Sequence, residues 1–374
     1  MGLPCMSDHR PTAQDSVQLG LDALILAVTE EVPRILTVRA PAGEIAIDIA
    51  TAGAAWLDAL PFGPLDPVAD RTLERGVRRW VLEQTGLALG YVEQLYTFGD
   101  RDRDPQRGAA GSDAMRTVSV AYLALVHEVR PVAGLAAQWR DVYKFLPWED
   151  WREGRPQVLD AVLAPALQGW AASADDDAVC LQRHERVEIA FGLGGAAWDA
   201  ERVLERYELL YEVGLVQEAN TGQAYSQAGT GESVRPAVAN IGEITPADTS
   251  SAGESMPPDW SITGRAMALD HRRILATALG RLRGKLKYRP VVFELLSGSF
   301  TLLRLQRTVE ALAGVRLHKA NFRRLVEAGG LVEGTGEHEP QTGGRPAELF
   351  RFRREVLRER RAPGVGLPGR RGGP

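Results

Sequence analysis

Basic and amide side chains gather near the carboxyl end of the chain, within one predicted helix. Lys319 and Arg323 stand four residues apart, with Asn321 and Arg324 beside them, and the first acid to follow is Glu327. Residues at this spacing share one face of a helix. Cations can hold phosphates there, while amide and guanidinium groups can contact base edges. The pattern predicts a surface that binds double-stranded DNA.

A second group follows in the glycine-rich turn at residues 334–344. Arg345 comes directly after two glycines, where a backbone can approach a phosphate closely. We therefore expect Thr342, Gly344 and Arg345 to contact DNA as well. The alternative is a charged surface that serves only solubility, as most runs of charge do.

The charge distribution agrees with a separate basic module. Residues 261–374 hold 23 Lys and Arg against 10 Asp and Glu, whereas residues 1–260 hold 21 against 39. A basic segment joined to an acidic body is typical of a DNA-binding domain on a carrier domain. We expect two domains and a linker.

The elements of the basic module follow from periodicity and capping residues. Helices are predicted at 270–286, 301–313 and 318–328, and strands at 331–333 and 345–353. This order is that of a winged helix, whose third helix enters the major groove. The first helix also shows a predicted cationic face, formed by Arg272, Arg273, Arg281, Arg283 and Lys285. We assign residues 263–355 to this domain and 356–374 to a basic disordered tail.

The pattern of the amino-terminal body predicts an α+β fold. Short apolar runs predict a hairpin at 19–39, and strands follow at 91–98 and 117–126. Asp66 and Pro67 open a predicted helix that ends at Gly86. We assign 1–18 to a disordered tail, 19–130 to the first domain, 131–218 to a helical insertion and 219–262 to a flexible linker. The aromatic residues between Trp139 and Trp151 form core, a dimer interface or a ligand lid.

Cysteine and hydropathy patterns exclude several classes of protein. Cys5 and Cys180 cannot form a disulfide framework, and the pair Cys180 and His184 lacks further metal ligands. No apolar run reaches the length of a membrane span, and the amino terminus lacks the apolar core of a signal peptide. We expect a cytoplasmic protein with reduced thiols, no metal and no membrane association.

Two stretches resemble a known family. Residues 92–100 and 118–126 are similar to the Nudix domain of ADP-ribose pyrophosphatase relatives. Residues 288–352 are similar to the winged helix of the NrtR-type repressors, which are Nudix-related regulators of NAD metabolism. The resemblance implies an α+β protein with a Nudix-like α/β/α domain and a C-terminal winged helix. Residues 131–260 lie outside the usual pattern and would form the insertion and linker of a divergent branch.

The resemblance also allows the Nudix box to be aligned on its closing glycine. Four positions fit the motif, namely Arg79, Glu83, Gly86 and Leu87. Trp80 and Gln84 stand where glutamates hold magnesium ions, and Arg71 and Leu65 occupy the positions of the upstream glutamate and the opening glycine. One carboxylate cannot position a pair of metal ions. The prediction is therefore a protein that is not an enzyme.

For the effector, the resemblance implies ADP-ribose, NAD or a related nucleotide that is bound without being cleaved, and no cofactor. The candidate contacts are Tyr96, Phe98, Arg101 and Arg103, of which the two arginines could pair with phosphate oxygens. The alternative is a surface loop in which these arginines are neutralised by neighbouring acids, Asp100, Asp102 and Asp104.

Together these features predict a bacterial repressor of NAD metabolism genes that acts as a homodimer on palindromic DNA. Two other functions remain open. One is an active Nudix hydrolase of ADP-ribose-like nucleotides that uses Glu83 with acids such as Glu74. The other is an interaction module whose winged helix binds protein.

Overall fold

The computed structural model describes residues 17–41, 56–100, 116–129, 135–219, 262–339, 346–359, 361 and 364–365. Most of the predicted amino-terminal tail and of the linker at 219–262 lies outside these residues. So do five of the predicted contact residues, namely Arg101, Arg103, Thr342, Gly344 and Arg345.

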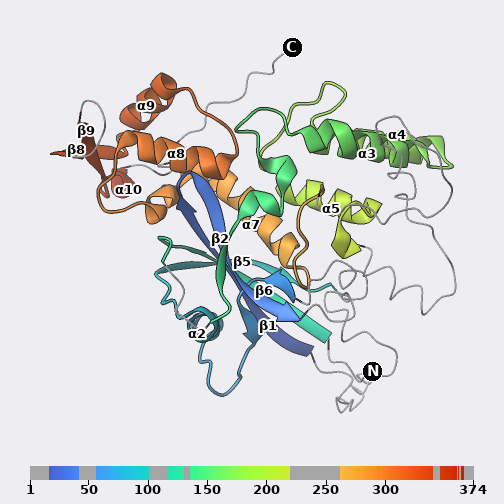
Figure 1. Ribbon diagram of the computed structural model, residues 1–374, viewed down its shortest axis with the longest axis horizontal. Coiled ribbons are helices and arrows are strands. Elements are labelled where there is room, and N and C mark those ends of the chain that lie inside the picture. Colours follow the sequence, from blue (N-terminus) through green and yellow to red (C-terminus); the bar gives the residue numbers. More distant parts are fainter. Residues whose placement is uncertain are drawn as a thin grey trace, which may run out of the picture.

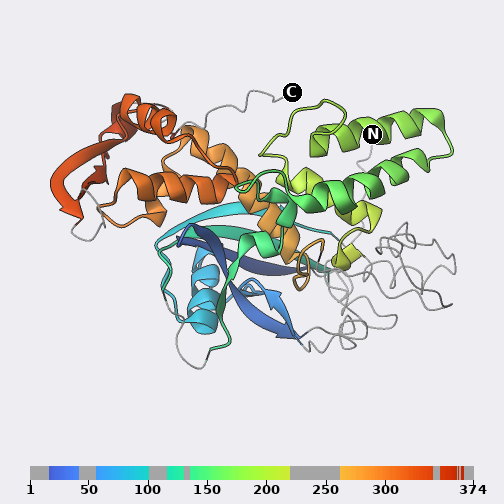
Figure 2. The same cartoon turned by 45° about the horizontal axis from the view of Figure 1, so that its top comes forward.

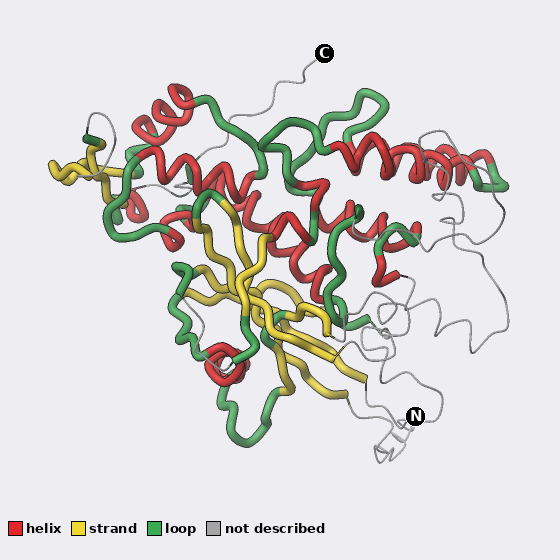
Figure 3. Tube along the Cα trace, viewed as in Figure 1, coloured by secondary structure: helices red, strands yellow, loops and turns green. Residues whose placement is uncertain are grey.

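A mixed sheet forms the centre of the amino-terminal half (Figure 3). Its strands are β1 (Val17–Thr29), β2 (Val32–Pro41), β3 (Trp56–Ala59), β4 (Phe62–Pro64), β5 (Tyr91–Phe98), β6 (Arg116–Leu125) and β7 (Gln138–Asp141). The order is β3-β2-β1-β6-β5, with β4 paired to β1 and β7 paired to β2. Only β1 and β6 run parallel among these pairs. Because β7 pairs with β2, the sheet extends past residue 130, where we expected the first domain to end.

Alternate residues of β1 face opposite sides of the sheet. Leu21 and Ile25 pack with one cluster of buried residues, and Leu24 and Leu26 pack with the other. Helix α2 (Leu73–Thr85) covers the first face, and α7 (His271–Tyr288) crosses the second (Figure 2). The predicted α+β fold with helices on both faces of the sheet is confirmed.

Helix α2 starts later than the sequence predicted. The Asp66 carboxylate accepts two backbone hydrogen bonds from the residues that follow Pro67, which makes a single turn and no helix. The helix begins at Leu73, after the Thr72 side chain caps it, and it ends before Gly86 at φ 73°. Two capping residues of similar preference lie close together here, and the second one begins the helix.

Helical elements dominate residues 142–213. They are η4 (Val142–Lys144), η5 (Pro147–Glu149), η6 (Leu159–Leu163), α3 (Ala164–Ala172), α4 (Asp177–Phe191) and α5 (Val203–Val213). Phe145 and Trp148 are fully buried, and Tyr143 and Trp151 nearly so. Of the three predicted roles for the aromatic residues, these four serve the core. Helices α3 and α4 lie side by side at one end of the molecule (Figure 1).

The carboxyl-terminal elements have the predicted order of a winged helix. They are η8 (Val291–Leu295), α8 (Leu302–Ala313), α9 (Lys319–Ala328), β8 (Val332–Glu339), β9 (Ala347–Phe352) and α10 (Val356–Glu359). The side chain of Thr301 caps α8, and Gly314 ends it at φ 69°. The hairpin of β8 and β9 projects at the end of the molecule opposite α3 and α4 (Figure 1).

The predicted disordered tail is wrong for the residues that follow β9. Residues 356–359 form α10, and the Val356 side chain is fully buried. Val365 donates a backbone hydrogen bond to the Leu286 carbonyl at 2.9 Å and is 2% exposed. Both valines join the buried core, and Val365 does so beside the end of α7.

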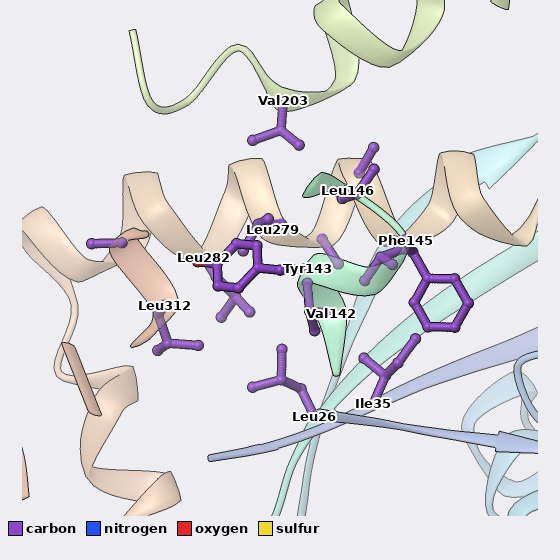
Figure 4. Packing of buried hydrophobic residues seen from close by; sticks show 14 of the residues in the cluster. Leu26, Ile35, Val142, Tyr143, Phe145, Leu146, Val203, Leu279, Leu282 and Leu312 are labelled. Atoms are coloured by element: carbon purple, nitrogen blue, oxygen red, sulfur yellow. The ribbon is translucent and has the colours of Figure 1, made fainter. Parts of the chain in front are cut away.

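One core joins the sheet, the helical segment and the winged helix. Figure 4 shows Leu26 and Ile35 of the sheet, Leu279 and Leu282 of α7, and Leu312 of α8 within the same cluster. The cluster continues to Phe322, Val326 and Leu331 of the winged helix. The predicted division into two domains therefore does not correspond to two separate cores.

Candidate nucleic-acid interface

Helix α9 has one buried face and one exposed face. Phe322 and Val326 are both fully buried against the core, as their spacing of four residues predicted. Lys319, Arg323 and Arg324 are exposed. The helix is thus held by its apolar side and presents cations to the solvent.

The cations of α9 differ in their contacts. Arg324 donates from Nη2 to Asn321 Oδ1 at 2.8 Å. Neither Lys319 nor Arg323 forms an ion pair with a residue that the structure describes. The helix also begins without a side-chain cap at His318 and has no acid in its first turn. This end of α9 is electrostatically suited to phosphate oxygens.

The β8–β9 hairpin lies beside α9 in sequence and completes the winged-helix layout. Its strands pair antiparallel from Val332 with Phe352 to Glu339 with Ala347. Aromatic packing holds its base, because the rings of Phe293 and Phe352 stack at 4.3 Å between centroids. The three predicted contacts at its tip belong to the residues outside the described ranges.

The predicted cationic face of α7 is wrong. Four of the five predicted cations pair with acids outside the helix: Arg272 with Glu218, Arg273 with Glu208 and Asp100, Arg283 with Glu149, and Lys285 with Glu93. The fifth, Arg281, donates to the Gln94 carbonyl at 3.3 Å. Arg272 and Arg283 are at most 1% exposed. Periodicity placed these residues on a helix, but their partners are remote in sequence. These contacts direct the cations of α7 to groups of the protein itself, so they do not form the free cationic face that the sequence predicted.

The Nudix-box residues of α2 form local contacts. Arg79 pairs with Asp70 at 2.7 Å and with Glu83 at 3.5 Å. The hydrogen bonds from Arg79 lower the pKa of Asp70 below its ordinary value. Glu74 pairs with Arg78 at 2.7 Å, so these two glutamates are each engaged with an arginine on the helix surface.

Trp80 and Gln84, which the resemblance would place at the positions of metal-binding glutamates, pack against β4. Trp80 Nε1 donates to the Pro64 carbonyl at 2.8 Å, and the indole lies directly over Gly63. Gln84 Nε2 donates to the Phe62 carbonyl at 2.7 Å, and its Oε1 accepts from the Phe62 N–H at 3.0 Å. Among the described residues, no three His, Cys, Asp or Glu side chains are grouped closely enough to hold a metal ion.

The predicted nucleotide contacts on β5 differ in accessibility. Tyr96 is 57% exposed, whereas Phe98 is 6% exposed and belongs to the core. Their rings meet edge to face at 5.4 Å between centroids. Asp100 pairs with Arg273 of α7. Of the two aromatic candidates, Tyr96 has the solvent-exposed ring.

Comparison with known proteins identifies the carboxyl-terminal segment. Residues 292–352 match the family model of the NrtR DNA-binding winged helix domain. This segment is an NrtR-type winged helix. The resemblance predicted from the sequence is confirmed for this part of the chain. Helix α7, which we expected to be the first helix of the winged-helix domain, precedes the matched residues.

Individual proteins resemble the chain over different shares of its length. A stretch of 86 residues is 38% identical to the ADPR responsive transcriptional repressor NtrR of Acinetobacter baylyi; it covers 23% of this chain and 34% of that protein, about a third of its length. The NrtR of Shewanella oneidensis, solved with a 27mer DNA, is 19% identical with a TM-score of 0.48, covering 91% of this chain and 95% of that chain. The Nudix domain of the same protein with ADP ribose is 25% identical with a TM-score of 0.28, covering 36% and 80%.

A buried carboxylate fixes the turn that precedes α9 in the NrtR-type winged helix. Glu310, 1% exposed, accepts from the Leu317 N–H at 2.9 Å and from Gln306 Nε2 at 2.8 Å. Arg307 and Arg316 also donate to it, at 3.0 and 3.2 Å. Burial alone would raise the pKa of Glu310, but these hydrogen bonds outweigh it and lower the pKa.

The same turn is held by groups of the amino-terminal half. The last carbonyls of a helix lack partners within it. Tyr143 Oη donates to the Ala311 carbonyl at 2.7 Å, and Arg283 Nε donates to that of Leu312 at 3.1 Å. Burial raises the pKa of Tyr143 to about 12, so the phenol stays protonated and remains a donor.

Arg283 also belongs to a buried ionic cluster, which consists of Glu149, Arg206 and Arg283. Arg206 donates to both carboxylate oxygens of Glu149, at 2.6 and 3.0 Å, and Arg283 Nη1 donates to one of them. Burial would raise the pKa of Glu149, but the two guanidinium charges dominate and lower it. The cluster connects η5, α5 and α7, and Arg283 joins it to the end of α8 in the NrtR-type winged helix.

Sequence reasoning missed Glu149, Arg206 and Glu310, and it also missed Glu31. Glu31, at the tip of the β1–β2 hairpin with φ 64°, lies 3.3 Å from Arg307 Nε and 3.2 Å from Arg316 Nη1. Arg152 donates to its backbone carbonyl at 2.6 Å. An acid in a hairpin turn gives no sequence signal of such a partner. The hairpin tip therefore links the sheet to the turn before α9.

The helices show no sign of a transmembrane segment. None of the helices that the structure describes combines the length and apolar composition needed to cross a bilayer.

Proposed function

We propose that the protein is a DNA-binding transcriptional regulator that represses genes of NAD metabolism. The observation that carries the proposal is α9 of the NrtR-type winged helix, where Lys319 and Arg323 are exposed and without an ion-pair partner among the described residues. The name of the A. baylyi relative, an ADPR responsive transcriptional repressor, supports it. Since the partner is genomic DNA, we place the protein in the cytoplasm.

In this proposal α9 enters the major groove with Lys319, Asn321, Arg323 and Arg324. The hairpin tip, with Thr342, Gly344 and Arg345, contacts the backbone nearby. One winged helix offers few side chains that contact bases, so a homodimer on a palindromic site doubles the specificity. The winged-helix domain is assigned to residues 263–355.

The amino-terminal half is the sensor in this proposal, with residues 19–130 as a Nudix-like domain and 131–218 as its insertion. Its effector is ADP-ribose or a related nucleotide, and no cofactor is required. Tyr96, Phe98, Arg101 and Arg103 remain the candidate contacts. The exposed ring of Tyr96 supports a stacking contact with a nucleotide base.

The sensor binds its nucleotide without hydrolysing it. Trp80 and Gln84 occupy positions of metal-binding glutamates and engage β4, which leaves Glu83 as the acid of the box. A single carboxylate cannot position the metal ions that bridge a diphosphate. The test is incubation with ADP-ribose and magnesium, in which no turnover is expected. If ADP-ribose were hydrolysed and Glu83→Gln abolished this turnover, the protein would be an active Nudix hydrolase instead.

The regulator proposal is tested by anisotropy titrations of the full chain with duplex DNA from its own upstream region, with and without ADP-ribose or NAD. Affinity should fall steeply as salt rises. Arg323→Ala should lose about 1–3 kcal/mol of binding free energy on the specific site if the side chain contacts a base. Arg186→Ala is the matched control, because Arg186 is an exposed arginine on α4 that pairs with Glu212. Equal weak binding of the unmodified chain to every duplex would refute a sequence-specific regulator.

A further inference from the structure

Two side chains of the exposed part of α9 are joined by a hydrogen bond. Arg324 Nη2 donates to Asn321 Oδ1 at 2.8 Å. The residues stand three apart, so their side chains are neighbours on the helix surface. The buried residues Phe322 and Val326 hold the helix through its opposite side.

This contact fixes how the amide of Asn321 can be used. A guanidinium group has five N–H donors and no acceptor, so it must face the carbonyl oxygen of the amide. The Nδ2 group of Asn321 is then directed away from Arg324. An asparagine that acts alone contacts adenine by accepting from N6 and donating to N7. Here one lone pair of that oxygen accepts from Arg324, and the positive charge of the guanidinium group disfavours a second donor such as the adenine amino group.

We propose that Asn321 and Arg324 form a donor-only pair that selects a guanine in the major groove. Guanine presents two neighbouring acceptors, O6 and N7, whereas adenine presents one acceptor and an amino donor. The donors of the pair complement guanine, and the charge of Arg324 disfavours the adenine amino group. This inference rests on the proposed function, because it requires α9 to lie in the major groove.

Arg324 is the specificity-determining member of the donor-only pair. Without it, both lone pairs of the Asn321 carbonyl oxygen are open, and no positive charge opposes the adenine amino group. Arg323 is the matched comparison, since it is an exposed arginine on the same helix, whereas the hydrogen bond to Asn321 comes from Arg324. We expect it to hold a phosphate or a different base.

The experiment selects duplexes from a random library with the full chain and then measures affinities for single base-pair variants of the selected site. Replacing one particular G·C pair should weaken binding roughly 5- to 150-fold. Asn321→Ala and Arg324→Ala should both lose this discrimination, at that same position, and the double variant should lose no more. Arg324→Ala should shift the preference there toward A·T. Arg323→Ala should leave the preference at that position unchanged.

A chemical probe tests the same contact from the side of the DNA. Replacing that guanine by 7-deazaguanine, which lacks the N7 acceptor, should weaken binding of the unmodified chain and leave Arg324→Ala little affected. Three outcomes would overturn the inference: an adenine preference at the position sensitive to Asn321, different base pairs affected by the two variants, or an equal loss on all sequences for Arg324→Ala. Failure to select any sequence would instead refute the proposed function.

Discussion

Replacing Glu149 with glutamine tests the buried ionic cluster. The change preserves the shape of the side chain but removes the negative charge between Arg206 and Arg283, both at most 1% exposed. The new amide still offers one oxygen, yet its nitrogen only donates and must face a guanidinium donor. Two positive charges then remain buried without a counter-charge.

The expected loss of stability is about 3–5 kcal/mol, the cost of breaking a buried ion pair by removing one partner. That is a large fraction of the roughly 5–15 kcal/mol by which native proteins are stable. Three elements that support the winged helix, η5, α5 and α7, meet at Glu149. We therefore expect the reduced stability to be accompanied by weaker DNA binding near the unfolding transition.

The assay is equilibrium urea denaturation followed by tryptophan fluorescence and far-UV circular dichroism, whose transitions must coincide for a two-state analysis. The fluorescence reports on the site directly, because Trp148 precedes Glu149 and the guanidinium of Arg206 lies 3.8 Å from the ring centroid of Trp198. With an m-value of about 3 kcal/mol per M, the midpoint should fall by roughly 1–1.7 M.

Two variants calibrate the result. Glu153 is 88% exposed and pairs with Arg316 at the surface, so Glu153→Gln should cost less than about 1 kcal/mol. Glu149→Asp keeps the charge on a shorter side chain and should fall between the other two. If Glu149→Gln were no more damaging than Glu153→Gln, the reasoning about uncompensated buried charge would be refuted.

Three further predictions follow from other contacts. Gln84→Glu removes the donor to the Phe62 carbonyl and should lower the free energy of unfolding by about 1–3 kcal/mol, without creating ADP-ribose hydrolysis. Unchanged stability in a thermal melt would contradict the pair of hydrogen bonds between Gln84 and the Phe62 backbone. Glu31→Gln should lower the free energy of unfolding by less than about 1 kcal/mol, because the ion pairs of Glu31 with Arg307 and Arg316 are partly exposed. Amide hydrogen exchange at the turn between α8 and α9 should nevertheless become faster. Unaltered exchange would argue against a link between the β1–β2 hairpin and this turn. The lowered pKa values of Glu149 and Glu310 add stability that is present above their unfolded pKa near 4.5 and is lost as pH falls through the lower folded values. Urea midpoints below pH 4.5 should therefore drop with acidity, less steeply in Glu149→Gln.

Local signals predicted the winged helix well. Thr301 and Gly314 mark the two ends of α8 because capping depends only on adjacent backbone groups. Phe322 and Val326 were correctly placed on one face of α9, since helical spacing alone determines which residues share a face. The start of α2 was misplaced where two capping signals competed, at Asp66 and at Thr72.

Contacts between distant segments escaped prediction. The pairing of β7 with β2 extends the sheet into the expected insertion, and Val365 packs on α7 although it lies in a basic tail. The tertiary structure also packs Phe98, a candidate nucleotide contact, within the core, where it is 6% exposed. In each case the deciding partner is remote in the chain, and composition carries no information about it.

The sequence by itself determined the basic carboxyl-terminal module, the order of its helices and hairpin, and the cations of α9. Only the tertiary structure decided which cations are available. Arg272 and Arg283 have the same charge and helical setting as Arg323, yet acids from far along the chain surround them in a low-dielectric core. Arg323 stays exposed because no described acid pairs with it. Charge is a property of the residue, whereas its neutralisation depends on which distant segments pack beside it.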